Sequence, residues 1–191
     1  HVIYTYNGDA QRIAKIVNGQ TTTFVVDGNR SPCETVEERD GPGAVSATYT
    51  FGMGRIASRE GSATNFDLAD RLSSPRLLTT PAGTISGARS YDAFGAATVL
   101  AGSAGRFGFD GERLDPETGL VPLRARQFNP ETGRFLSKDP LGVAAGLNGY
   151  LFCGADPVNN VDPLGLEAKD PEWLPKVAWF LKMFGAWNDA Y

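Results

Sequence analysis

Short segments that carry aromatic and β-branched residues alternate with turns rich in Gly, Asp and Asn along the first hundred residues. Residues 4–6 and 21–26 are typical strand segments of this kind, and each is followed by such a turn. Three of the turns contain an Asx-Gly dipeptide, namely Asn7-Gly8, Asn18-Gly19 and Asp27-Gly28. These dipeptides favour two-residue hairpin loops, in which both central residues need positive φ. The pattern therefore predicts a succession of antiparallel β-hairpins.

From residue 106 the pattern changes to a series of proline turns. The run that begins at Asp115-Pro116 recurs fourteen positions later at Asn129-Pro130, and Asp-Pro-Leu-Gly occurs at Asp139 and again at Asp162. Such sequences favour turns because Pro sets φ, the Asx side chain caps the local backbone and Gly adopts the left-handed region. Residues 121–128 are predicted to form one strand, with two arginines on one side: Arg124 and Arg126. The segment 106–166 is thus expected to be a tightly folded, loop-rich module.

The last 25 residues differ again and predict a short helix. Pro175 suits a first helical turn, and Gly185 suits a stop just after residue 184. Because this helix has almost no polar face, we expect it to pack on the inner face of the sheet. The fold class expected for the whole chain is mainly β, with hairpins over 1–105, the loop-rich module over 106–166 and a helix within 167–191.

The composition of the chain limits its possible partners and catalytic groups. The formal net charge of −4 repels phosphate backbones, so no nucleic-acid partner is expected. The longest apolar cluster, 177–184, contains Lys182 and is too short to span a bilayer. His1 is the one histidine, which excludes catalysis that depends on a central histidine and leaves carboxylates as candidates. Two cysteines, Cys33 and Cys153, lie outside any Cys-x-x-Cys pair and are expected to be buried free thiols, with a disulfide or a metal site as the alternative. No metal or cofactor is expected otherwise.

The module carries a nearly continuous set of motifs over about fifty residues. They are Leu114-Asp-Pro-Glu-Thr-Gly-Leu120, Leu123-Arg-Ala-Arg126, Phe128-Asn-Pro-Glu-Thr-Gly-Arg-Phe-Leu-Ser-Lys-Asp-Pro-Leu-Gly142, Gly146-Leu-Asn-Gly-Tyr150 and Asp156-Pro-Val-Asn-Asn-Val-Asp-Pro-Leu-Gly-Leu166. This string resembles the Rhs repeat-associated core domain of the Rhs/YD-repeat polymorphic toxins. The upstream hairpins are similar to the YD repeats of the same family.

The resemblance implies a sheet of stacked hairpins that spirals into a hollow shell, with the core domain curled inward as a plug. It further implies an aspartic autoprotease that cuts after Leu166, between Leu166 and Glu167, and releases a C-terminal toxin held inside the shell. The implied active residues are Asp139 and Asp162, with Arg126 in support. The partners would be the rest of the shell and the toxin, and also a secretion-system spike or a cognate immunity protein. The whole protein would be an exported bacterial effector.

Elementary chemistry is compatible with self-cleavage by the two aspartates and also with a purely structural role for them. Two carboxylates held close together can share a proton, so that one acts as a base on water and the other as an acid. Arg126 could steady one of them through a bidentate contact, and the reaction would be a single turnover. The alternative is a purely structural end-piece, because an isolated Asp-Pro-x-Gly is ordinarily a type I turn. A third reading places the toxin itself in residues 167–191, but 25 residues are too few for an enzyme core.

Overall fold

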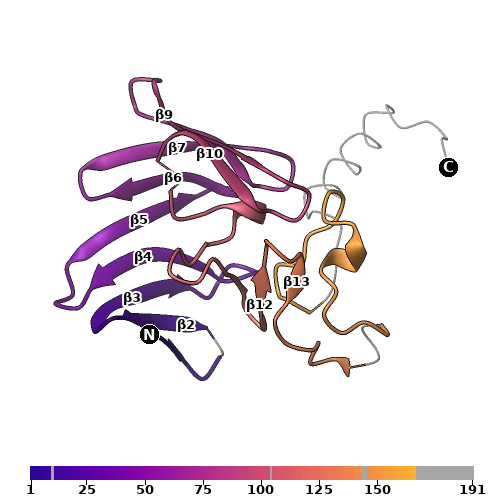
Figure 1. The fold of residues 1–191 in the computed structure, drawn as a ribbon. Coiled ribbons are helices and arrows are strands. Elements are labelled where there is room, and N and C mark those ends of the chain that lie inside the picture. The colour runs from indigo at the N-terminus through magenta and orange to yellow at the C-terminus, as the bar shows by residue number, and fades with distance from the viewer. Residues whose placement is uncertain (10, 104, 143–145, 167–191) are drawn as a thin grey trace.

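A computed structural model describes residues 1–9, 11–103, 105–142 and 146–166. Ten strands form one antiparallel sheet in which each strand pairs with its neighbours in sequence (Figure 1). They are β1 (Val2–Tyr6), β2 (Arg12–Val17), β3 (Gln20–Asp27), β4 (Glu34–Asp40), β5 (Val45–Phe51), β6 (Arg55–Glu60), β7 (Ala63–Ala69), β8 (Pro75–Thr79), β9 (Ile85–Tyr91) and β10 (Ala97–Gly102). The prediction of a mainly β fold built from consecutive hairpins is confirmed.

The loops between the strands follow local turn chemistry only in part. Asn18 and Gly19 both have positive φ, at 49° and 86°, and they form the predicted two-residue loop between β2 and β3. At Asn7-Gly8 and Asp27-Gly28 the two-residue prediction was wrong, because longer loops connect those strands. The side-chain oxygen of Asn7 instead accepts a hydrogen bond from the N–H of Gln11, at 2.9 Å, and so closes a wider turn.

The two faces of the sheet differ in what they carry. On β7, Phe66 and Leu68 are exposed, whereas the carboxylate of Asp67 between them is an ion-paired group on the opposite face. That opposite face holds buried charged side chains from strands far apart in the sheet, including Lys15 on β2 and Arg89 on β9. The residues that follow β10 lie alongside the sheet in Figure 1, and their contacts show that they cover this charged face.

A second, three-stranded sheet lies within the module. It comprises β11 (Val121–Leu123), β12 (Arg126–Asn129) and β13 (Arg134–Phe135), and two short 3₁₀ turns flank it at η1 (Phe109–Gly111) and η3 (Cys153–Ala155). The prediction of one continuous strand over 121–128 was wrong. Leu123 pairs with Arg126, so the chain reverses at Arg124 and Ala125, and Arg124 adopts a φ of +48°. Arg124 and Arg126, which were expected on one side of a single strand, therefore lie in different places: Arg124 is in the turn and Arg126 begins β12.

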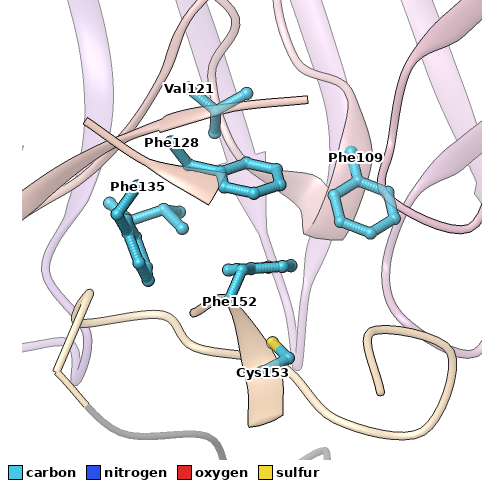
Figure 2. Close-up of a cluster of buried hydrophobic side chains, with 7 residues drawn as sticks. Phe109, Val121, Phe128, Phe135, Phe152 and Cys153 are labelled. Carbon is cyan, nitrogen blue, oxygen red and sulfur yellow. The ribbon is translucent and has the colours of Figure 1, made fainter. Parts of the chain in front are cut away.

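An aromatic core fills the module. Phe128 and Phe152 are fully buried and stack with ring centroids 4.0 Å apart (Figure 2). Phe109 and Phe135 pack around this pair, with centroids 6.2 Å and 5.6 Å from Phe152. Cys153 is buried in the same cluster and is a free thiol. Cys33 is also free but only partly buried, so the prediction of two buried free thiols is confirmed for Cys153 and is wrong about the burial of Cys33.

Buried ion pairs join the module to the sheet. The carboxylate of Glu38 on β4 accepts hydrogen bonds from Arg106, at 2.8 Å, and from Arg113. Asp115 was expected to do no more than make a turn, yet its carboxylate is fully buried and contacts Arg12 and Lys15 of β2. Charge complementarity across the covered face thus adds to the apolar packing that positions the module.

Some predictions fall on residues that the structure does not describe. The expected helix at 175–184 and the whole region 167–191 lie outside the described residues. Among the described residues, no helix has the length and apolar character needed to cross a membrane.

Candidate active site

The two Asp-Pro-Leu-Gly turns share a bond from the glycine N–H to the aspartate carbonyl oxygen, but the two aspartate side chains accept from different positions. In the first, Oδ1 of Asp139 accepts a hydrogen bond from the N–H of Leu141 at 2.8 Å. In the second, Oδ1 of Asp162 accepts from the N–H of Leu166 at 2.9 Å. Each turn is closed by its glycine, and Gly165 has a φ of +64°, where a Cβ would lie 2.3 Å from the carbonyl oxygen of Leu123. The turn chemistry thus occupies one oxygen of each carboxylate.

Arg126 brings the remaining two oxygens together. Its Nη2 lies 2.9 Å from Oδ2 of Asp139 and 3.2 Å from Oδ2 of Asp162. All three residues are buried, at 5%, 8% and 2% exposure respectively. The guanidinium also stacks on the ring of Phe135, 3.6 Å from its centroid. The hairpin reversal before β12 directs Arg126 to this position, so the three predicted residues meet around one nitrogen atom.

The same arginine holds the chain that leads to the predicted cleavage position. Nε of Arg126 donates to the carbonyl oxygen of Gly165, and the N–H of Ala125 donates to the carbonyl oxygen of Leu164 at 3.1 Å. With the bond from Leu166 to Asp162, three consecutive residues are fixed against the aspartate pair. Leu166 is the last residue described, and Glu167 lies outside the described residues.

The hydrogen bonds define what the pair can do chemically. Each of the four carboxylate oxygens of Asp139 and Asp162 lies within 3.2 Å of a nitrogen that carries hydrogen. Backbone N–H groups and guanidinium can only donate. Each carboxylate is therefore held by one backbone N–H and by Arg126, and Arg126 offsets the repulsion between the two carboxylates.

A third acidic residue lies near Asp162 and was missed in the sequence. Asp110 lines a cavity of about 480 Å³ together with Asp162. Its Oδ1 is buried and has no hydrogen-bond partner among the described residues. Burial raises the pKa of Asp110 well above its ordinary value, and the neighbouring carboxylates of Glu112, Asp70 and Asp162 add to this effect. No spacing singles it out, because Phe-Asp-Gly is an ordinary turn sequence.

Within the part of the chain that the structure describes, no group of three or more His, Cys, Asp or Glu side chains could hold a metal ion.

Comparison with known proteins assigns the family. No family model matches the sequence. The chain is 33% identical over 172 residues to the tRNA3(Ser)-specific nuclease WapA of Bacillus spizizenii, which covers 85% of this chain and 7% of that protein. It is 43% identical over 58 residues to the toxin protein Tse5 of Pseudomonas aeruginosa, which covers 30% of this chain and 4% of that protein.

Solved structures share the fold. The Photorhabdus luminescens Tc holotoxin pore matches 88% of this chain and 9% of its own, with a TM-score of 0.67 and 21% identity. The crystal structure of TcdB2-TccC3 matches 86% and 9%, with a TM-score of 0.64 and 23% identity. The chain belongs to the Rhs/YD-repeat toxin family. This Rhs chain is a shell- or toxin-associated part, and it spans less than a tenth of the length of the WapA and Tse5 proteins named above.

Proposed function

We propose that this Rhs chain is the end of a toxin shell and that it cuts its own backbone between Leu166 and Glu167. One observation carries the proposal. Asp162 binds the N–H of Leu166 at 2.9 Å through one oxygen, while its other oxygen shares a single Arg126 nitrogen with Asp139. The residue that carries the predicted scissile bond is thus held by one of the predicted active residues.

The proposed reaction is hydrolysis by an aspartic autoprotease. One carboxylate of the pair removes a proton from a water molecule, which attacks the carbonyl carbon of Leu166. Arg126 keeps both carboxylates in place and offsets their negative charge. Because all three side chains are buried, the ion pairs between them are stronger than they would be in water. Because the substrate is the next peptide bond of the same chain, the reaction is a single turnover.

The proposed shell role is supported by the ten-stranded sheet and by the module packed on its charged face. The proposed partners are the rest of the shell, which continues the sheet, and a C-terminal toxin that follows residue 166. A secretion-system spike and a cognate immunity protein are further proposed partners. In this proposal the whole protein is an exported bacterial effector.

Intact-mass measurement under denaturing conditions tests the cut directly, even where the pieces stay associated. We expect the wild-type chain to yield a fragment that ends at Leu166. Asp139→Asn and Asp162→Asn keep the side-chain size but remove an ionisable carboxyl, so both should remain uncut. Arg126→Lys should slow the cut, because lysine keeps the charge but loses the fixed fork of donors.

Asp156→Asn is the matched control. Asp156 also precedes a proline, but among the described residues its exposed carboxylate accepts hydrogen bonds from Asn159 alone, at 3.0 Å, within its own turn. This variant should be cut at the wild-type rate. If the wild type stays intact for days at mildly acidic and neutral pH, the proposal fails. The purely structural end-piece, in which Asp139 and Asp162 only cap turns, would then account for the same hydrogen bonds.

A further inference from the structure

All three nitrogens of the Arg126 guanidinium have partners around the aspartate pair. Nη2 lies 2.9 Å from Oδ2 of Asp139 and 3.2 Å from Oδ2 of Asp162. Nε donates to the carbonyl oxygen of Gly165, and Nη1 donates to the carbonyl oxygen of Gly149 at 3.2 Å. A guanidinium is planar and its N–H groups point outward in that plane, so these contacts use its edge and leave its two faces for other groups. A rotation of the plane would therefore weaken several of these contacts at once.

The ring of Phe135 lies against this guanidinium. Cζ of Arg126 is 3.6 Å from the centre of the ring, which is van der Waals contact between two flat groups. Both residues are buried, at 5% exposure for Arg126 and 2% for Phe135. The face of a benzene ring carries partial negative charge and attracts a cation, and this attraction is strongest where water is excluded. The ring thus favours one orientation of the guanidinium by its charge as well as by its shape.

The backbone holds Phe135 in place from two sides. Phe135 belongs to β13, which pairs with β12, and its N–H donates to the carbonyl oxygen of Tyr150 at 3.1 Å. The carbonyl oxygen of Gly149, one residue earlier, accepts from Arg126 at 3.2 Å and from the N–H of Asp139 at 2.8 Å. Two consecutive residues of one segment therefore align the ring, the arginine and one of the two aspartates.

We propose that Phe135 is a positioning residue of the cleavage site, an inference that rests on the proposed self-cleavage. The face of its ring holds the Arg126 guanidinium in the orientation in which Nη2 meets both aspartates and Nε meets the carbonyl oxygen of Gly165. This orientation matters because Gly165 precedes Leu166, whose carbonyl carbon is attacked by water in the proposed reaction. A displacement of about 1 Å in a group that orients reacting atoms can cost about 100-fold in rate. Phe135 acts through Arg126 rather than on the reacting atoms.

Phe135→Leu on the full chain tests this assignment, with Phe152→Leu as the matched control. Both changes replace a buried ring of the same aromatic core by an aliphatic side chain, and the two rings pack edge to face with centroids 5.6 Å apart (Figure 2). In intact-mass time courses, Phe135→Leu should be cut at least about 10-fold more slowly than the wild type, because the attraction between ring and cation is lost. Phe152→Leu should be cut at close to the wild-type rate. If both variants are slowed equally, the core as a whole supports the site and the inference about Phe135 is overturned.

Fluorinated phenylalanine at position 135 separates the charge of the ring face from its packing. Successive fluorine atoms withdraw negative charge from the face while the ring keeps nearly the same shape, so this series serves even where Phe135→Leu fails to fold. The cleavage rate should fall stepwise from phenylalanine through the monofluorinated to the trifluorinated ring at position 135, and it should stay constant for the same series at position 152. A constant rate at position 135 overturns the inference while the proposed self-cleavage stands. A wild type that is never cut overturns the proposed function, and this inference with it.

Discussion

Glu38 lies on β4 with its carboxylate on the covered face of the sheet, and replacing it with glutamine tests how the module is held. The side chain is fully buried, and it accepts hydrogen bonds from Arg113, Arg106 and the hydroxyl of Tyr49. Arg113 is itself only 7% exposed, and burial lowers its pKa to about 10, which reflects the cost of keeping its charge away from water. Glu38→Gln removes the charge that offsets this cost.

The loss of unfolding free energy expected for Glu38→Gln depends on how deeply its arginine partners are buried. Removing one member of a buried ion pair costs about 3–5 kcal/mol, because the other charge stays desolvated. Arg106 is 37% exposed and can recover water, and Arg113 retains Asp115 at 3.9 Å. We therefore expect the lower end of the range, about 3 kcal/mol. In urea this corresponds to a midpoint lower by roughly 1–3 M.

Urea denaturation followed by far-ultraviolet circular dichroism measures this loss. Glu37→Gln, one residue earlier on the same strand, is the control, because Glu37 pairs with the exposed Arg39 on the other face. An exposed pair of this kind contributes about 1 kcal/mol or less. If Glu38→Gln and Glu37→Gln lower the midpoint equally, buried charge does not hold the module on the sheet.

Three further changes probe other parts of the structure. Phe152→Ala should cost about 3–5 kcal/mol in the same denaturation assay, because it leaves a cavity in the aromatic core; a loss under 1 kcal/mol would contradict that packing. Gly165→Ala should abolish the cut in intact-mass measurements, since its Cβ would collide with the carbonyl oxygen of Leu123 and displace the Asp162 turn; normal cleavage would refute this. Burial and then Glu112 raise the pKa of Glu34 to about 7, so its contribution to stability is full below about pH 4.5 and lost as pH rises to 7. Glu34→Gln should thus raise the urea midpoint at pH 8 relative to wild type but not at pH 4.5, and an equal effect at both values would argue against a raised pKa.

Local chemistry made most of the fold predictable. The hairpins and the proline turns depend on a few adjacent residues, and the glycines that close the turns at Asp139 and Asp162 do have positive φ. The strand break at Arg124-Ala125 was not predictable in this way, because no Gly, Asn or Pro marks it. Contacts from distant segments hold that turn: Arg124 donates to the carbonyl oxygens of Pro163 and Cys33.

The site residues also differ in whether the local sequence or distant contacts reveal their role. Asp139, Asp162 and Arg126 were named from a motif, and the structure brings them together. Asp115 was taken for a simple turn residue, because its partner Lys15 lies one hundred positions earlier in the chain. Asp110 was missed for a similar reason: what distinguishes it is burial beside other acids, which only the folded chain creates.

The contacts at the site also bear on what happens after the proposed cut. Among the described residues, the carbonyl oxygens of Leu164 and Gly165 accept from β12 and the turn before it, and Leu166 donates to Asp162. The newly formed carboxyl group of Leu166 would therefore stay beside the aspartate pair and Arg126. A site that keeps its own product in this way cannot turn over again. The geometry thus fits a reaction that is needed only once per chain.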